Sequence, residues 1–167
     1  MKSTKDRTEI FAQTEKTVTE AGFTIISRDE NRPWGGFFVI DETQSAEFTK
    51  KYFKGIDIET LKISGKLSPK ILMVAPEKRL SWQYHHRRAE IWKVLIGRVG
   101  VMTSDTDIQG LVNEYDPGAL VTLKQGERHR LVGLREWGVI AEIWQHTDPL
   151  NPSDEDDIVR VQDDFGR

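Results

Sequence analysis

The segment SWQYHHRRAEIWKVLIG, from Ser81 to Gly97, determines what fold and chemistry we expect of this chain. Gln83, His85 and Glu90 follow one another in the order Q-x-H-x4-E. Side chains two residues apart on a strand point to the same face, so Gln83 and His85 can converge on one cavity. Glu90 lies just past a tight connection, from which a returning strand can bring its carboxylate back to that cavity. The segment therefore predicts a metal site.

A fourth donor is expected from the segment GERHR, where His129 lies three residues after Gly126 and ahead of another strand-like run. A hydrogen-bonded structural role is commoner than metal binding for an arbitrary histidine. Three of the four histidines, however, fall inside these two segments. We therefore predict one divalent metal ion per chain, held by Gln83, His85, Glu90 and His129. Such a mixed nitrogen and oxygen set suits Zn2+ and also Mn2+, Fe2+, Co2+ or Ni2+, and the residues alone do not choose among them.

The two segments resemble the two motifs of the cupin superfamily, G-x5-H-x-H-x4-E-x6-G and, downstream, G-x5-P-x-G-x2-H-x3-N. QYHHRRAEIW, residues 83–92, is most similar to type II mannose-6-phosphate isomerases, in which Gln replaces the first His and Arg-Ala-Glu follows the His cluster. Gly118, Lys124, Gly126 and His129 fit the second motif. RPWG at 32–35 and EDDIVRVQDDFGR at 155–167 are similar to that family's opening and closing signatures, so the resemblance covers roughly residues 30 to 167.

Several positions depart from the family pattern. Arg87 and Ile91 each stand where the family has a His, and Glu77 stands where it has a Gly before the first motif. Lys124 takes the Pro position and Gly133 the Asn position of the second motif. None of these changes removes a predicted metal ligand, but they alter the charge and shape around the cavity mouth. The exact sugar therefore stays open.

Short strand-like runs separated by turns, with few helices, predict an all-β protein with a jelly-roll barrel. The resemblance implies the double-stranded β-helix of cupins. Helical spacing of apolar residues predicts a short N-terminal helix from about Thr4 to Ala21 and one inserted helix over Ser45–Phe53. The inserted helix is expected to pack over one end of the barrel, a lid over the mouth being the alternative.

A chain of 167 residues is the length of one domain with a sizeable core. We predict an N-terminal helix and strand extension at 1–29 and a cupin barrel domain at 30–167. The larger type II enzymes carry a nucleotidyltransferase domain before the cupin, so the resemblance implies the cupin part standing alone. The acidic tail has the composition of a frayed end, whereas its match to the closing signature favours a tail pinned across the barrel.

Period-two alternation predicts which side chains face the barrel interior. In the first motif it places Glu90, Trp92, Val94 and Ile96 on one face of a strand. In GVIAEIWQH, residues 138–146, it separates two faces, one with Val139, Ala141 and Ile143 and the other with Ile140, Glu142 and Trp144.

Composition excludes several classes of function. Lys and Arg number 24 against 27 Asp and Glu, so a net charge of -3 offers no general attraction to nucleic acid or to an anionic membrane. Cysteine is absent, which excludes disulfides and thiolate zinc sites. The first residues have no apolar signal region, and no later run approaches the length of a membrane span. We therefore expect a cytoplasmic protein without nucleic-acid or membrane partners.

The resemblance implies a zinc-dependent aldose-ketose isomerase that acts on a phosphorylated sugar, most readily mannose 6-phosphate and fructose 6-phosphate. It makes Arg88 and Lys70 catalytic, although a lone lysine opening a strand is ordinarily solvent-exposed. The residues expected to contact substrate are Trp34, His86, Glu142 and Arg130. Which group is the proton-transfer base is left open. Exposed sheet edges and the stripe of the N-terminal helix further predict a homodimer.

Two other interpretations compete with this function. A related hexose or heptose phosphate requires only changes at the rim. A cupin that binds a sugar without catalysis is motivated by Arg87 and Ile91. A metal-dependent dioxygenase is less favoured, because the glutamine ligand and the basic residues near the motifs suit a phosphorylated sugar better.

Overall fold

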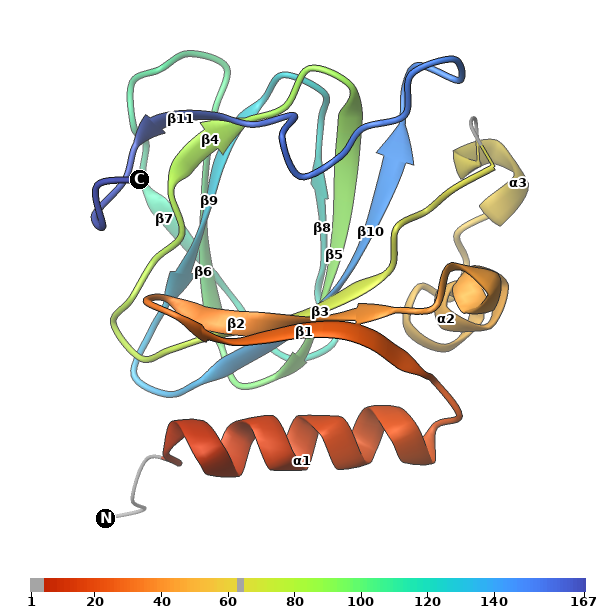
Figure 1. The fold of residues 1–167 in the computed structure, drawn as a ribbon. Coiled ribbons are helices and arrows are strands. Elements are labelled where there is room, and N and C mark those ends of the chain that lie inside the picture. Colours follow the sequence, from red (N-terminus) through yellow and green to blue (C-terminus); the bar gives the residue numbers. More distant parts are fainter. Residues whose placement is uncertain (1–4, 63–64) are drawn as a thin grey trace.

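The computed structural model describes residues 5–62 and 65–167. Two antiparallel sheets face each other and enclose the barrel interior (Figure 1). The strands of the six-stranded sheet are, in spatial order, β1 (Ile25–Arg32), β2 (Gly35–Ile40), β3 (Lys70–Val74), β10 (Gly138–His146), β5 (Arg88–Ile96) and β8 (Leu120–Leu123). Those of the five-stranded sheet are β11 (Val159–Gln162), β4 (Trp82–Tyr84), β9 (Arg128–Gly133), β6 (Val99–Ser104) and β7 (Val112–Tyr115). The predicted all-β jelly-roll class is confirmed.

β10 shows how alternation divides the molecule into two cores. Val139, Ala141 and Ile143 point away from the barrel interior into an outer apolar cluster, which α1 (Arg7–Glu20) and α2 (Ser45–Tyr52) complete. Ile140 belongs to a second, inner apolar cluster between the sheets, and Glu142 and Trp144 line the cavity beside it. The two faces predicted for this strand are confirmed.

One residue of β5 lies on the other face from the one predicted. Val139 pairs with Ile96 and Ile140 pairs with Val94, so one extra residue is inserted in β5 between these pairs. A bulge of this kind reverses the alternation beyond it. Trp92 and Val94 therefore join the inner cluster, as expected, whereas Ile96 packs against the outer cluster. The prediction that Ile96 continues the interior face is wrong.

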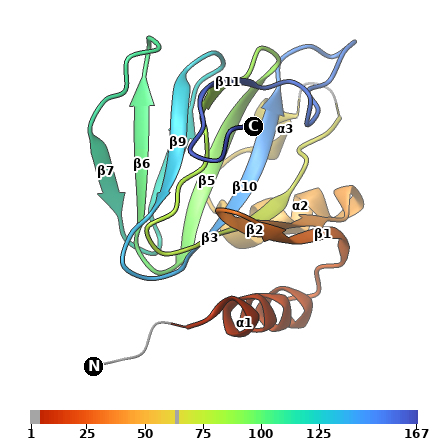
Figure 2. The same ribbon diagram turned by 60° about the vertical axis from the view of Figure 1, so that its left-hand side comes forward.

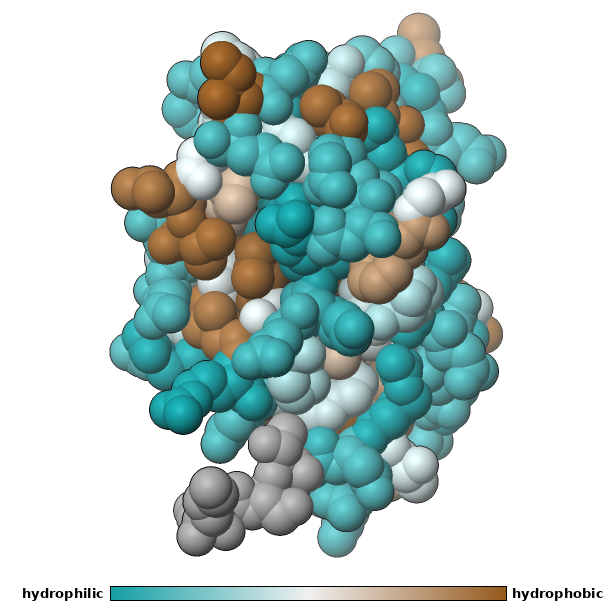
Figure 3. Space-filling model, turned by 90° about the vertical axis from the view of Figure 1, so that its left-hand side faces the viewer, coloured by the Kyte–Doolittle hydropathy of each residue, from teal (hydrophilic) through white to brown (hydrophobic). Residues whose placement is uncertain are grey.

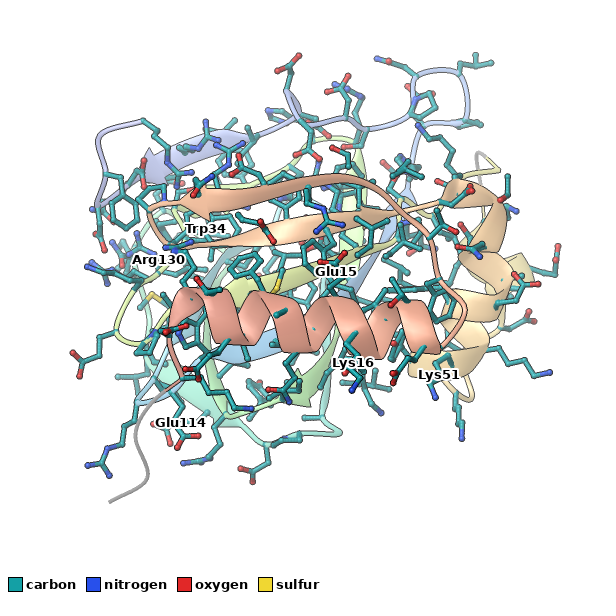
Figure 4. All side chains as sticks on the ribbon, turned by 60° about the horizontal axis from the view of Figure 1, so that its bottom comes forward. Glu15, Lys16, Trp34, Lys51, Glu114 and Arg130 are labelled. Carbon is teal, nitrogen blue, oxygen red and sulfur yellow. The ribbon has the colours of Figure 1, made fainter. Side chains whose placement is uncertain are left out.

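The N-terminal helix is confirmed and covers the outer face of β1 and β2 (Figures 1 and 4). Asp6 caps α1 by accepting from the Glu9 amide at 2.8 Å, and Glu15, labelled in Figure 4, forms an ion pair with Arg28 at 2.8 Å. The helix packs so tightly that a Cβ at Gly36 would lie 2.6 Å from the Phe11 ring. No helix of the described residues is long and apolar enough to cross a membrane.

The inserted helix forms as predicted and packs over the outside of the barrel. Phe48 and Phe53 are buried in the outer cluster, and no residue of the segment from Ser45 to Phe53 lines the cavity. The lid alternative is therefore wrong. Two short elements that the sequence did not predict flank this helix, the 3-10 turn η1 (Glu42–Gln44) before it and α3 (Ile58–Leu61) after it.

The C-terminal tail is pinned, as the closing signature suggested. β11 pairs antiparallel with β4, and the segment before it crosses one end of the barrel (Figures 1 and 2). Asp157 fixes this segment, because its carboxylate accepts from the amides of His86 and Arg87, each at 2.9 Å, and from the Ser153 hydroxyl at 2.6 Å. The tail thus becomes a wall of the barrel opening.

Candidate metal centre and adjoining cavity

Three of the four predicted ligands meet inside the barrel. His85 directly follows β4, Glu90 lies on β5 and His129 lies on β9. Their ligand atoms all lie within 4.8 Å of one another, and each residue is only 2% exposed. The spacing of the first motif and the strand-borne His129 therefore place two imidazoles and a carboxylate in one dry site.

Hydrogen bonds fix both imidazoles in the form that binds a metal. The Nδ1 atom of His85 lies 2.7 Å from the Asp157 carbonyl, and the Nδ1 atom of His129 lies 3.1 Å from the Glu127 carbonyl. A carbonyl only accepts, so each Nδ1 carries a proton, and the Nε2 atom of each ring is turned toward the centre. Carbonyl groups that accept from the other ring nitrogen orient metal-binding histidines in this way.

The environment of the His129 Nε2 atom gives the clearest sign that these residues suit a cation. It is buried, it has no hydrogen-bond partner among the described residues, and it lies 3.7 Å from Glu90 Oε2. Burial lowers the pKa of His129 to about 4, so near neutral pH its lone pair faces a carboxylate without a proton between them. Two electron-rich atoms in this arrangement repel each other unless a cation lies between them. The residues present therefore fit a divalent metal ion.

Glu90 is held in its charged form. Burial by itself would raise the pKa of this carboxyl, but His85 and Arg88 lower the pKa well below its ordinary value. The Glu90 Oε1 atom is 3.0 Å from His85 Nε2 and accepts from Arg88 Nε at 2.9 Å. The carboxylate is thus oriented before any metal binds.

Gln83 lies beside this group, directly opposite His129 in the pairing of β4 with β9. Its Nε2 atom is 3.4 Å from His85 Nε2, and its Oε1 atom accepts from the Ser81 hydroxyl at 2.5 Å. A half-turn of the amide exchanges the two atoms and presents the oxygen to the centre. The predicted fourth ligand is therefore within reach of the site, on its open side.

Arg88 is buried, and every nitrogen of its guanidinium contacts a protein group. Beyond its bond to Glu90, its Nη1 donates to the Ser153 hydroxyl and to the Asp154 carbonyl, each at 2.9 Å, and its Nη2 is 3.3 Å from His85 Nε2. Its guanidinium carbon lies 3.6 Å from the centroid of the Trp144 ring. Arg88 therefore links the tail to two of the metal ligands.

A second pair of ionisable side chains, Glu142 on β10 and Lys70 on β3, also lines the cavity. Both oxygens of Glu142 accept indole N-H bonds, from Trp92 at 2.7 Å and from Trp144 at 2.8 Å. Burial, reinforced by the charge of Glu90, raises the pKa of Glu142 to about 8. Its partner across the strands is Lys70, which is 6% exposed, pairs with Glu155 and lies 4.2 Å from the Trp144 centroid. Lys70 is thus not the exposed lysine that its position alone suggested.

A cavity of about 110 Å³ joins these groups. Its walls contain most of the predicted site residues, namely Trp34, Lys70, Gln83, Arg88, Glu90, His129, Arg130 and Glu142. His85 lies just behind them. His86 is not brought into the cavity: its ring is exposed and stands edge-on to Tyr84, because the peptide after His85 turns outward to bind Asp157.

Arg130 borders the cavity but is fully buried among protein acceptors. Its guanidinium donates to the Leu80 carbonyl at 2.7 Å and to the side chains of Gln109 and Gln162. It joins β9 to the loop after β6 and to the tail. The observed contacts are therefore those of a residue that holds the wall in place.

Sequence reasoning missed three contributors from the second half of the chain. His146 is buried and fixes the tail, accepting from the Ser153 amide at 2.9 Å and contacting the Ser68 hydroxyl at 3.0 Å. Asp157 orients His85 through its carbonyl. Arg160 lines the cavity from β11. The alternation of Ile158, Arg160 and Gln162 was the available signal for the last of these.

Comparison with known proteins agrees with this geometry. The family model described as mannose-6-phosphate isomerase C-terminal matches residues 48–163, more than half of the chain. The chain belongs to this family. This membership places it in the cupin superfamily, as the motif spacing suggested. A search of curated proteins finds none that matches.

Two solved structures show the same barrel, and a third has a higher sequence identity with this chain. Oxalate decarboxylase matches with a TM-score of 0.54 at 14% identity, over 80% of this chain and 30% of that chain. The capsular polysaccharide assembling protein CapF from Staphylococcus aureus gives 0.54 at 15% identity, over 81% and 34%. A Cupin 2 conserved barrel domain protein from Salinispora arenicola CNS-205 gives 0.40 at 25% identity, over 47% and 61%. This chain therefore spans about a third of the length of the oxalate decarboxylase and CapF chains.

Proposed function

We propose that this cupin is a metal-dependent aldose-ketose isomerase of sugar phosphates, and that it interconverts mannose 6-phosphate and fructose 6-phosphate. The observation that carries the proposal is the buried set of His85, Glu90 and His129 at the end of a cavity that also contains Glu142 and Lys70. Membership in the mannose-6-phosphate isomerase C-terminal family supports the choice of reaction.

The reaction moves a proton between C1 and C2 of the open-chain sugar through an enediol. His85, Glu90, His129 and Gln83 would hold a divalent ion, which would supply polarisation of the sugar carbonyl and stabilisation of negative charge on its oxygen. Zinc is the ion that the family resemblance favours, and Mn, Fe, Co or Ni suit the same donors. Aromatic rings beside the cavity, among them Trp34 and Trp144, offer apolar faces for the sugar carbons.

Glu142 is the proton-transfer group in this proposal. A general base is most effective when its pKa lies near the working pH, and burial brings the pKa of Glu142 to about 8. The two indole bonds hold both of its oxygens in place while leaving each a further lone pair for substrate. Lys70 lies next to it and balances the charge that the carboxylate gains on losing its proton. Arg88 acts by orienting Glu90.

Deuterium exchange tests the proposal. Metal-loaded protein is incubated with fructose 6-phosphate in deuterated water, and the sugar is followed by proton NMR. Isomerisation through an enediol introduces solvent deuterium at the carbon next to the carbonyl, and Glu142→Gln should slow this exchange at least about 100-fold at unchanged metal content. The matched control is Gln145→Glu, a change on the same strand away from the cavity lining.

The alternatives predict different outcomes of the same experiment. Exchange with another hexose or a heptose phosphate, but not with fructose 6-phosphate, would keep the reaction and replace the substrate. If the protein binds a sugar phosphate tightly but exchanges no deuterium into any sugar phosphate, the isomerase proposal is wrong and the protein is a sugar-binding cupin.

We also infer that the protein is a homodimer. β7 is an edge strand, and the loop before it and the strand itself expose Ile108, Leu111 and Val112. Apolar side chains gather on this side of the molecule (Figure 3). A second copy related by a two-fold axis would cover this edge with the same edge of its own. Light scattering should give a dimer mass, and a monomer mass from the Leu111→Lys and Val112→Lys double variant.

A further inference from the structure

Arg160 differs from the other arginines around the cavity. Arg32 is paired with Asp29 at 3.0 Å and Arg167 with Asp163 at 2.8 Å. Arg88 and Arg130 are buried and bonded to protein acceptors. Within residues 5–62 and 65–167, Arg160 has no hydrogen bond or ion pair from its side chain, although it lines the cavity. A cavity arginine without a partner has five donors available for a ligand.

The strand register places this guanidinium beside the metal centre. In the pairing of β11 with β4, Arg160 lies directly opposite Gln83. Side chains opposite each other in an antiparallel pair stand on the same face, so Arg160 and Gln83 both border the cavity. Arg160 also lines a wider outer hollow of about 560 Å³ that shares Arg32, Phe37, Glu155 and Ile158 with the inner cavity. It therefore stands where the inner cavity opens outward.

The charges around this opening favour an anion near Arg160. Arg32 and Arg167 line the same cavity, and the charge of each is offset by its ion pair with Asp29 or Asp163, so Arg160 carries the positive charge that stays available. The acidic residues at the opening are Glu155 and Asp156, and the charge of Glu155 is offset by its ion pair with Lys70. A guanidinium binds a phosphate dianion through two parallel hydrogen bonds.

We propose that Arg160 binds the phosphate group of the substrate at the cavity mouth and thereby selects phosphorylated over free sugars. This inference rests on the proposed function. It leaves the carbonyl end of an open-chain sugar directed inward, toward Glu142 and the metal ligands. The proposal also gives the two arginines different roles. Arg88, whose guanidinium nitrogens all contact protein groups, positions Glu90, whereas Arg160 recognises the substrate.

Calorimetric binding to the metal-loaded protein tests the proposal without requiring turnover. Mannose 6-phosphate, free mannose and inorganic phosphate are titrated into wild type, Arg160→Gln and Arg135→Gln. Arg135 is the matched control, because it is exposed, lies outside both hollows and has no ion pair within the described residues. Loss of a charge-assisted phosphate contact should weaken mannose 6-phosphate binding roughly ten- to a hundredfold in Arg160→Gln. Free mannose should bind equally to all three proteins.

Kinetics supply the second measurement. Arg160→Gln should raise KM for mannose 6-phosphate by the same roughly ten- to a hundredfold with kcat nearly unchanged, and Arg160→Lys should recover part of the loss. Arg88→Lys should instead lower kcat, since it disturbs Glu90 and not the phosphate. Metal content and melting temperature of Arg160→Gln should equal those of wild type.

Three results would overturn the assignment or separate it from the proposed function. Unchanged mannose 6-phosphate affinity in Arg160→Gln would remove the phosphate role. An equal loss of affinity for mannose and mannose 6-phosphate in Arg160→Gln would mean that Arg160 shapes the cavity and does not bind the phosphate. Arg160-dependent phosphate binding by a wild-type protein that exchanges no deuterium into any sugar phosphate would keep the anion site and reject the isomerase.

Discussion

The two faces of the six-stranded sheet are built from the same strands for opposite purposes. On β10, Val139, Ala141 and Ile143 pack with α1 and α2 into the outer apolar cluster. The alternating residues Glu142 and Trp144 face a cavity whose walls are charged and aromatic. The outer face gains free energy by removing apolar surface from water, about 25 cal/mol per Å². On the inner face, burial of charged and polar groups costs free energy, because water would solvate these groups well.

This difference explains why the tail crosses the inner side and the helices cover the outer side. Buried charges are stable only when they are paired and hydrogen-bonded, and the tail supplies such partners through Ser153, Glu155 and Asp157. The outer face needs only apolar side chains of suitable shape. Changes on the inner face should therefore act on metal and substrate, whereas changes on the outer face should act on folding.

The largest expected effect is on the inner face, in His129→Ala. Wild type should bind about one divalent metal ion per chain and melt at a higher temperature when the metal is added, because only the folded state presents the site. The variant should bind metal at least about 100-fold more weakly and show no metal-induced rise in melting temperature. Elemental analysis and differential scanning fluorimetry measure both.

The metal-free variant provides the control for this prediction. Within the part of the chain that the structure describes, the buried Nε2 atom of His129 has no hydrogen-bond partner, so removing it relieves an unfavourable contact while it creates a small cavity. Metal-free His129→Ala should melt close to metal-free wild type. Wild-type metal content in the variant would mean that the three-residue group is not a metal centre.

The next effect is on the outer face, in Phe48→Ala. Phe48 is 0% exposed and lies with its ring centroid 5.4 Å from that of Phe23 and 4.9 Å from that of Tyr52. Truncation should lower the free energy of unfolding by about 3–5 kcal/mol, through lost burial and the cavity left behind. Urea unfolding measures the loss. At urea concentrations below the unfolding transition, the variant should bind as much metal per chain as wild type. A variant that folds but loses its metal would contradict the separation of the two faces.

Much of both faces was predictable from local pattern. Period-two alternation assigned the two faces of residues 139 to 144 on β10, and motif spacing predicted that His85, Glu90 and His129 would meet. The helical spacing of Phe48 and Tyr52 identified the inserted helix. These features depend on residues near one another in sequence or on motifs whose geometry is fixed by strand pairing.

What the sequence did not predict depends on register and on long-range partners. The bulge that turns Ile96 outward leaves no trace in a run of apolar residues. The exposure of His86 follows from its amide binding Asp157, 71 residues later. The location of Arg160 opposite Gln83 requires the pairing of the tail with β4. Each is a consequence of how distant segments meet.

Asp157 provides a pH test of how the tail supports the inner face. Burial would raise its pKa, but the Ser153 hydroxyl and the amides of His86 and Arg87 lower the pKa from 3.8 to about 2. A depressed folded pKa contributes stability above the unfolded value, here near 3.8, and that contribution is lost as the pH falls toward 2. Asp157→Asn should cost about 2 kcal/mol at pH 7, and the difference from wild type should shrink between pH 4 and 2. Urea unfolding of the metal-free proteins over this range measures it; a constant difference would remove the role of the charge.

The smallest expected effect is on the free energy of unfolding of a Glu77 variant, at a position that lies on neither face of the sheet. Glu77 is exposed in the connection after β3 and has a φ of 59°, at the position where the family pattern has Gly. The left-handed conformation costs a residue with a Cβ about 1–2 kcal/mol, and the added freedom of glycine in the unfolded chain offsets about half of the gain. Glu77→Gly should therefore raise the free energy of unfolding by about 0.5–1 kcal/mol, with metal binding unchanged. Glu77→Ala keeps the backbone strain and removes the charge, so it should stay within about 0.5 kcal/mol of wild type. Equal stabilisation by both variants in urea unfolding would assign the effect to the charge of Glu77 instead of its backbone.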